Sequence, residues 1–236
     1  MEARAGVMVA GGLVALGLVL AGLAVGQGVA RVRQDVPTVT VRGVAERDVV
    51  ANLATWTIAT QTNGNDLASV QARADRDAET IRTFLQKNGF SPAEISVRGS
   101  GVSQWYDGSR GVLNISLRQR FQARTNDIAR MQQAFASQAE IIRAGVALDS
   151  DGAGGLTYSF TRLNDVKPEM IAEATRAARE AADQFAADSG TKVGGIQTAT
   201  QGLFTITGRD GDLGPGTDTP DQKVRVVTTV TFRLED

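Results

Sequence analysis

The chain opens on an unbroken apolar segment. Residues 6–26 contain no charged side chain, and the next charge is Arg31. A helix needs about 20 apolar residues to cross the hydrocarbon core of a bilayer, so this segment is long enough to be a retained anchor. A cleaved signal peptide is the alternative, because small residues two apart occur at 22–24 and 28–30. We assign residues 1–5 to a flank, 6–30 to a transmembrane anchor or uncleaved signal, 31–37 to a linker and 38–236 to a folded domain.

Small residues four apart occur within this apolar segment. Gly11 with Ala15, and Gly22 with Gly26, have the spacing that lets two helix backbones approach closely in lipid. Gly and Ala are also frequent in membrane helices without marking a contact. Both interpretations stay open for these four positions.

Beyond residue 37 the apolar positions repeat either every second residue, as in a strand, or every three to four residues, as in a helix. Stretches rich in Val and Thr at 37–46 and 49–62 predict strands, with Gly43 as a candidate bulge. The polar turn at 63–66 then predicts the start of a helix, which Gly89 ends. The apolar stripe of this helix is Leu67, Val70, Ala74, Ala78, Ile81 and Leu85.

The strongest local pattern is a hairpin. Residues 95–105 are predicted to be extended, 106–109 form the turn, and the return strand alternates strictly. Its apolar face carries Leu113, Ile115, Leu117, Phe121 and Ala123, and its polar face carries Asn114, Ser116, Arg118, Arg120, Gln122 and Arg124. One face is therefore core, and the other is wet or forms an interface.

The remaining patterns complete the fold class. A helix capped at 125–127, a strand at 156–160, a helix starting near Pro168 and a closing strand at 224–234 are predicted. The stripe of the last helix is Ile171, Ala174, Ala178, Ala181 and Phe185. The sum is an α+β domain in which antiparallel sheets pack with about three helices.

Composition narrows the chemistry. The chain has 25 Lys+Arg against 26 Asp+Glu, with no His and no Cys. It cannot supply a Ser-His-Asp triad, a Cys nucleophile, or a thiolate or imidazole metal site. The balanced charge gives no general attraction to nucleic acid. We therefore expect no enzymatic activity, no catalytic residue, no cofactor, no metal site and no nucleic-acid partner.

Two short motifs match patterns of a serine acyl-enzyme and of a calcium loop only in part. Ser189 and Lys192 match S-x-x-K, but here the serine closes a helix beside Gly190 instead of opening one. Acidic pairs at Asp149 with Asp151 and at Asp210 with Asp212 lack the further ligands of a calcium loop. Chance and turn formation account for these motifs.

Two groups of residues are candidates for an interaction surface. Arg118, Arg120 and Arg124 form a row on one face of a strand, which could bind phosphate, anionic lipid or an acidic partner chain. Alternatively, these arginines only form a charged, solvent-exposed sheet face that keeps the protein soluble. Trp105 and Tyr106, beside the hairpin turn, could contact a neighbouring subunit or a membrane, or pack over the hairpin end.

Three stretches carry a family resemblance. VTVRGVAERDVVANLATWTIATQT, EATRAAREAADQFAADSGTKVGGI and VRVVTTVTFRLED resemble the SIMPL-domain family, which includes YggE-like proteins and brucellar periplasmic immunogenic proteins. The stretches bracket residues 38–236. The apolar N-terminus looks longer than a usual signal peptide of the family, and the segment 207–222 is longer and richer in Gly and Asp than expected.

The resemblance implies an exported, self-associating α+β domain, ring-like or channel-like in some relatives, with a link to envelope or oxidative-stress tolerance. It implies no active site. We therefore expect a homo-oligomeric scaffold in the periplasm, tethered to the bacterial inner membrane by the N-terminal helix. The alternative is a soluble periplasmic binding or protective module released by signal cleavage.

Overall fold

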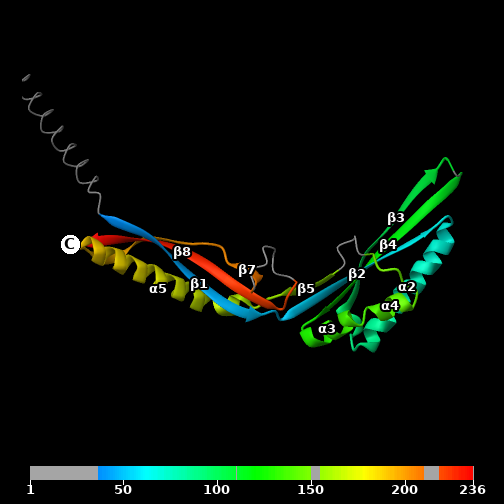
Figure 1. Ribbon diagram of the computed structural model, residues 1–236, viewed down its shortest axis with the longest axis horizontal. Helices are drawn as coiled ribbons and strands as arrows, with labels where there is room; N and C mark the ends of the chain where they lie inside the picture. Colours follow the sequence, from blue (N-terminus) through cyan, green and yellow to red (C-terminus); the bar gives the residue numbers. More distant parts are fainter. Residues whose placement is uncertain (1–36, 110, 150–154, 210–217, 236) are drawn as a thin grey trace, which may run out of the picture. The chain divides into compact units, whose positions relative to one another are not determined.

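The computed structural model describes residues 37–109, 111–149, 155–209 and 218–235 (Figure 1). The candidate anchor at 6–30, with Gly11, Ala15, Gly22 and Gly26, lies outside these residues, as do Asp151, Asp210 and Asp212. Among the described residues, no helix combines the length and the apolar character needed to cross a membrane.

Two four-stranded sheets organise the described residues. Sheet 1 has the order β1 (Thr38–Val50), β8 (Asp221–Glu235) and β6 (Lys192–Gln201), and β7 (Thr205–Gly208) pairs antiparallel with β8. Sheet 2 has the order β3 (Ile95–Asp107), β4 (Val112–Thr125), β2 (Leu53–Gly64) and β5 (Gly155–Ser159), with antiparallel neighbours throughout. The predicted α+β class is confirmed.

The contacts divide the described residues into two units. The first contains 37–41, 179–199 and 230–235. In it, the Leu234 amide donates to the Pro37 carbonyl, and the hydroxyls of Thr40 and Thr231 share a hydrogen bond. The Arg179 guanidinium donates to the carbonyls of residues 193 and 194 and lies over the Phe232 ring. Arg179 thus fastens the long helix α5 (Leu163–Ser189) to β6 and β8.

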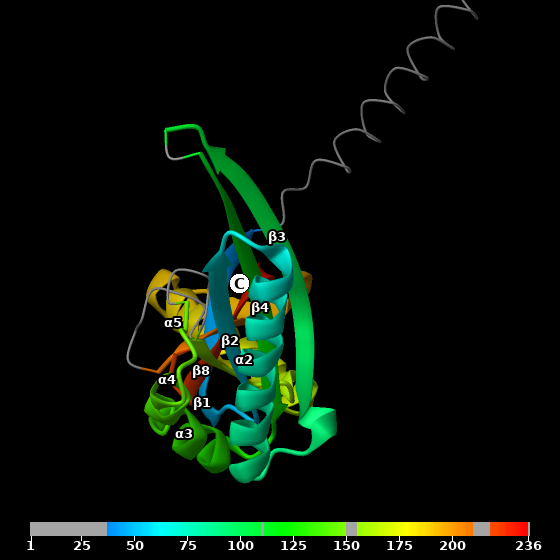
Figure 2. The same ribbon diagram turned by 90° about the vertical axis from the view of Figure 1, so that its right-hand side faces the viewer.

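The second unit, residues 42–178 and 200–229, contains all of sheet 2. Three helices lie on one face of this sheet, α2 (Leu67–Lys87), α3 (Ile128–Ala136) and α4 (Ala139–Arg143) (Figure 2). As predicted, Asp66 caps α2 by accepting from the Ser69 amide, and Gly89 ends it with a φ of 83°. Trp56 of β2 contacts Phe84 and Phe135 edge to face, which fixes two helices on the sheet.

The long helix α5 (Leu163–Ser189) corrects two predictions. It begins at Leu163, not near Pro168, because Leu163 and Val166 pack against the apolar cluster around Met170. Pro168 therefore lies inside the helix, where its missing N–H cannot donate to the carbonyl of Asn164, an exposed residue.

The buried stripe of α5 also differs from the predicted one. It runs at steps of four through Met170, Ala174, Ala178, Ala182 and Ala186. Ala181 is exposed, and Phe185 is 55% exposed, because both lie one position beside this stripe. The small side chains let a strand approach the helix closely.

Gly43 of β1 marks that close approach. A Cβ built at residue 43 would collide with the Ala174 carbonyl oxygen and lie 2.5 Å from the Ala178 amide nitrogen, both in the backbone of α5. The glycine predicted as a bulge is therefore the contact point between strand and helix.

Candidate interaction surface

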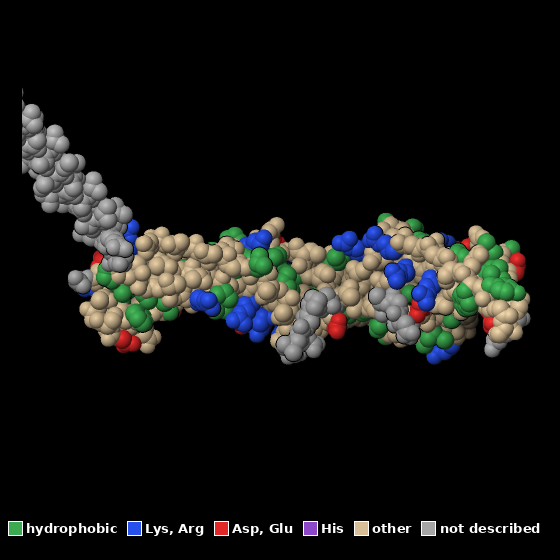
Figure 3. Space-filling model, turned by 90° about the horizontal axis from the view of Figure 1, so that it is seen from above, with side chains coloured by type: hydrophobic (Ala, Val, Ile, Leu, Met, Phe, Trp, Pro, Cys, Tyr) green, Lys and Arg blue, Asp and Glu red, His purple; other side chains and the backbone are tan. Residues whose placement is uncertain are grey.

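A basic face covers the side of sheet 2 that carries no helix. Arg118, Arg120 and Arg124 of β4 are exposed there, as the alternation predicted. Arg98 of β3 joins them, with its Nε 2.7 Å from Gln122 Oε1. Figure 3 shows Lys and Arg side chains gathered over the strands of this sheet. We call Arg98, Arg118, Arg120 and Arg124 the basic face.

The basic face has unused bonding capacity. Arg118 donates from Nε to Gln61 Oε1 at 3.0 Å. The side chains of Arg120 and Arg124 have no hydrogen bond or ion pair to any residue that the structure describes. Neighbouring like charges raise the affinity of such a face for acidic or aromatic groups.

Glycines open the surface beside two of these arginines. Gly99 lies opposite Arg120 and Gly101 opposite Arg118 in the β3–β4 register, and the register shifts at Arg98. A Cβ at residue 99 or 101 would meet no atom within 4 Å. The result is a hollow of about 270 Å³, which we call the basic hollow. Its lining is Arg98, Gly99, Ser100, Gly101, Arg118 and Arg120.

The hairpin of β3 and β4 runs on past the end of β2. The last residue of β2, Gly64, pairs with Ile115, so residues 105–107 and 112–114 form a two-stranded ribbon beyond α2 (Figures 1 and 2). Trp105 is 53% exposed and Tyr106 is 67% exposed. Leu113, predicted to be core, is 40% exposed because none of the described helices or strands covers this end of the hairpin.

The ribbon carries exposed apolar side chains on both faces. Trp105 pairs with Asn114 on the side of the basic face, whereas Tyr106 pairs with Leu113 on the opposite side. Both alternatives for these aromatics, contact with a partner and packing over the hairpin end, stay predictions, although both side chains are more than half exposed. An exposed apolar ribbon of this kind typically contacts a partner.

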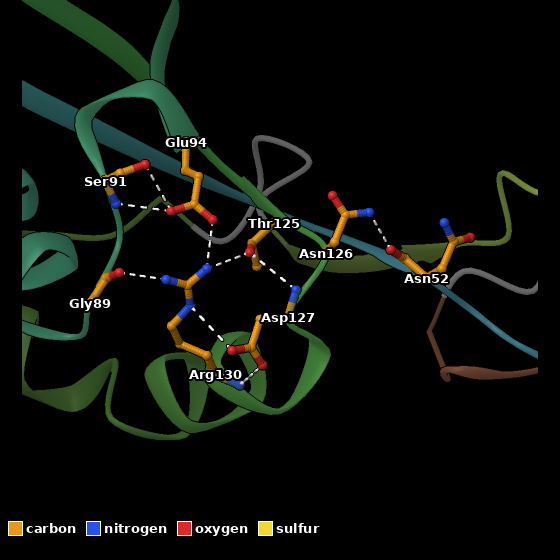
Figure 4. A network of polar contacts seen from close by, with 8 residues as sticks. All are labelled: Asn52, Gly89, Ser91, Glu94, Thr125, Asn126, Asp127 and Arg130. Atoms are coloured by element: carbon orange, nitrogen blue, oxygen red, sulfur yellow. Dashed lines mark hydrogen bonds and ion pairs between the residues drawn. The ribbon is translucent and has the colours of Figure 1, made fainter.

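A polar network that the sequence did not reveal braces the second unit (Figure 4). Arg130 of α3 places Nη2 at 2.6 Å from Glu94 Oε1 and 2.6 Å from Thr125 Oγ1, and its Nη1 donates to the Gly89 carbonyl. Its guanidinium also lies 4.9 Å from the centre of the Phe90 ring. We call this set the Arg130 brace.

The brace lowers the pKa of Glu94 to about 2. The hydrogen bond from the Thr125 hydroxyl is the largest cause, and bonds from Ser91 and the charge of Arg130 act in the same direction against the opposing effect of burial. The brace is thus a structural ion pair in which the Glu94 carboxylate is held in its charged form.

A pH titration checks this assignment. Because the folded pKa of Glu94 lies below its ordinary 4.5, the charged form contributes stability above pH 4.5, and this contribution disappears as pH falls toward 2. The wild type is therefore expected to be about 1–3 kcal/mol more stable than Glu94→Gln at pH 7, and the difference should vanish near pH 2. Denaturant unfolding at each pH measures it. A difference that persists undiminished at pH 2 would contradict the assignment.

A comparison with known families decides the identity. A family described as SIMPL, protein of unknown function (DUF541), matches residues 39–232. The chain belongs to the SIMPL family. A comparison with curated proteins found no match. The matched part of this SIMPL chain includes the basic face, the hairpin and the Arg130 brace.

In the SIMPL chain, Ser189 of the S-x-x-K match and Asp221, which lies beside the acidic pair Asp210 and Asp212 in the sequence, make structural contacts. The Ser189 hydroxyl donates to the carbonyls of Phe185 and Ala186 at the end of α5. Asp221 forms an ion pair with Arg209 at 3.0 Å. The described residues contain no group of three acidic side chains placed to hold a metal ion.

Proposed function

We propose that this SIMPL chain is a non-catalytic structural component that associates with copies of itself on the extracytoplasmic side of the membrane. The observation that carries the proposal is the β3–β4 hairpin, an apolar ribbon that stands clear of its own core. Exposed aromatic and aliphatic side chains of this density are characteristic of protein interfaces. A link to envelope or oxidative-stress tolerance belongs to the same proposal through the family resemblance.

The hairpin favours a protein partner over a bilayer. Its apex carries Asp107 and Ser109, which hydrogen-bond to each other, whereas its apolar side chains lie further down the two strands. Insertion into lipid would bury the charged apex before the apolar ribbon, which is costly. A protein surface can contact the ribbon and leave the apex in water.

The anchor is the second part of the proposal. A tether at residues 6–30 would hold the copies on one surface, so that weak contacts between domains become effective. N-terminal sequencing of the mature protein separates the two forms. A retained Met1 or Glu2 supports the anchor, and a start near Val25 or Arg31 shows the soluble periplasmic module instead.

Replacing the hairpin aromatics tests the interface. In detergent-solubilised full-length protein, Trp105→Ser/Tyr106→Ser is expected to raise the dissociation constant for self-association at least tenfold, because two exposed aromatic anchors are lost. Light scattering after size exclusion measures the mass. Phe185→Ser, which removes an equally exposed aromatic from α5, is the matched control and should leave the mass unchanged. A double variant that associates like the wild type would contradict the proposal.

A further inference from the structure

The free edge of β3 lacks the usual protection of an edge strand. β3 is the outer strand of sheet 2 and pairs only with β4 among the described strands. Natural edge strands are commonly blocked by charges, prolines or bulges. Here the bulge and the charge both lie at Arg98, and the following residues 99–106 contain neither a charge nor a proline. The segment from the bulge to the turn, residues 99–107, is therefore open to another strand.

We propose, building on the self-association argued above, that the β3 strands of two copies pair antiparallel about a two-fold axis at Ser103. Residues that face each other in an antiparallel pair must point to the same side of the sheet, so a strand paired with its own copy can only be centred on a residue. Centring on Ser103 matches the segment 99–107 to itself from end to end. It uses the whole regular strand, about 30 Å long, and stops at the bulge.

In this register, a side chain of the second copy enters the basic hollow. Trp105 of the second copy lies opposite Gly101, and Gly101 lies opposite Arg118, so the three residues form one row on the basic face. Because residue 101 has no side chain and open space above it, the indole can reach across to the guanidinium. Aromatic residues commonly cover strand glycines in this way.

A second row of residues places an acidic side chain of one copy near an arginine of the other. Asp107 of the second copy lies opposite Gly99, which lies opposite Arg120. Arg120 has no ion pair to any residue that the structure describes, and the space above Gly99 is also open. A carboxylate has room for several donors, so Asp107 can keep the bonds that it already makes, those to Ser109 among them, and still approach Arg120. The two-fold axis repeats both rows, which makes the contact self-complementary.

On the opposite face of the paired strands, no two side chains of like charge lie opposite each other. Val102 lies opposite Gln104 of the other copy, and Ser100 lies opposite Tyr106. The result is one continuous sheet that joins sheet 2 of both copies and removes both free edges.

A single cysteine tests the register directly, because the chain contains no cysteine of its own. In the proposed pair, Ser103 faces its own copy with Cα atoms about 5 Å apart, which suits a disulfide. Ser103→Cys in the detergent-solubilised full-length chain is expected to cross-link to a dimer under mild oxidation. Ser100→Cys, equally exposed, is the control, because its copy would lie about 20 Å away. Cross-linking of Ser100→Cys with none for Ser103→Cys would overturn the register.

A charge placed in the hollow provides a second readout. Gly101→Lys should raise the dissociation constant at least tenfold while leaving the fold intact, because its Cβ meets open space. Gly195→Lys, in equally open space on β6, is the matched control. If the wild type associates but neither Ser103→Cys cross-links nor Gly101→Lys dissociates it, the β3 pairing is wrong and self-association stands. If the wild type is monomeric, both proposals fail.

Discussion

Replacing Gly43 by valine is expected to lower the free energy of unfolding by about 3 kcal/mol. The added Cβ would collide with the Ala174 carbonyl oxygen, and its distance to the Ala174 carbonyl carbon would be only 2.9 Å. These are backbone atoms of α5, which cannot move aside as a flexible side chain can. The strand and the helix would therefore have to separate and lose the packing around Met170 and Ala174.

Denaturant unfolding followed by fluorescence measures this loss, since the buried Trp56 reports on the second unit. Gly155→Val is the matched control, because residue 155 lies in a strand of the same unit and a Cβ there meets nothing within 4 Å. Its effect should stay within about 0.5 kcal/mol of the wild type. Equal losses in the two variants would show that the glycine at residue 43 is not a packing requirement.

Removing the guanidinium of the brace is expected to have a similarly large effect. Arg130→Ala should cost about 3 kcal/mol, because it takes charged hydrogen bonds from Glu94, Thr125 and the Gly89 carbonyl at once. It also leaves the Glu94 carboxylate, whose side chain is only 23% exposed, without its counter-ion.

A surface ion pair of the same type provides the comparison. Arg82 pairs with Glu79 on α2, where both side chains are far more exposed. Arg82→Ala should therefore cost no more than about 0.5 kcal/mol. Unfolding curves of the two variants at pH 7 measure the difference, and an Arg130→Ala loss as small as that of Arg82→Ala would contradict the role of the brace.

The hairpin shows what the sequence could predict. Alternation along residues 113–124, interrupted only at Gln119, specified which side chains share a face, and the structure places Arg118, Arg120 and Arg124 together as predicted. The exposure of Leu113 could not be predicted in this way. It depends on where β2 ends relative to β4, which is a property of the register between distant segments.

The features that the sequence patterns did not predict also depend on contacts between residues far apart in the sequence. The Arg130 brace joins two separate segments, 89–94 and 125–130, and no local spacing connects Gly89 and Glu94 with Arg130. Arg98 joins the basic face only because the bulge shifts the register of β3. The predicted α5 stripe was right at Ala174 and Ala178 and wrong at Ala181 and Phe185 for a related reason. Alanines occur on several sides of this helix, so only the packed partner, at Gly43, decides which of them are buried.

The most direct test of the central claim is the mass of the full-length protein in detergent over a dilution series. Light scattering should show a species of at least two chains at high concentration, which dissociates on dilution and carries the hairpin at its interface. A mass of one chain, 24.9 kDa, at every concentration would contradict self-association and everything built on it.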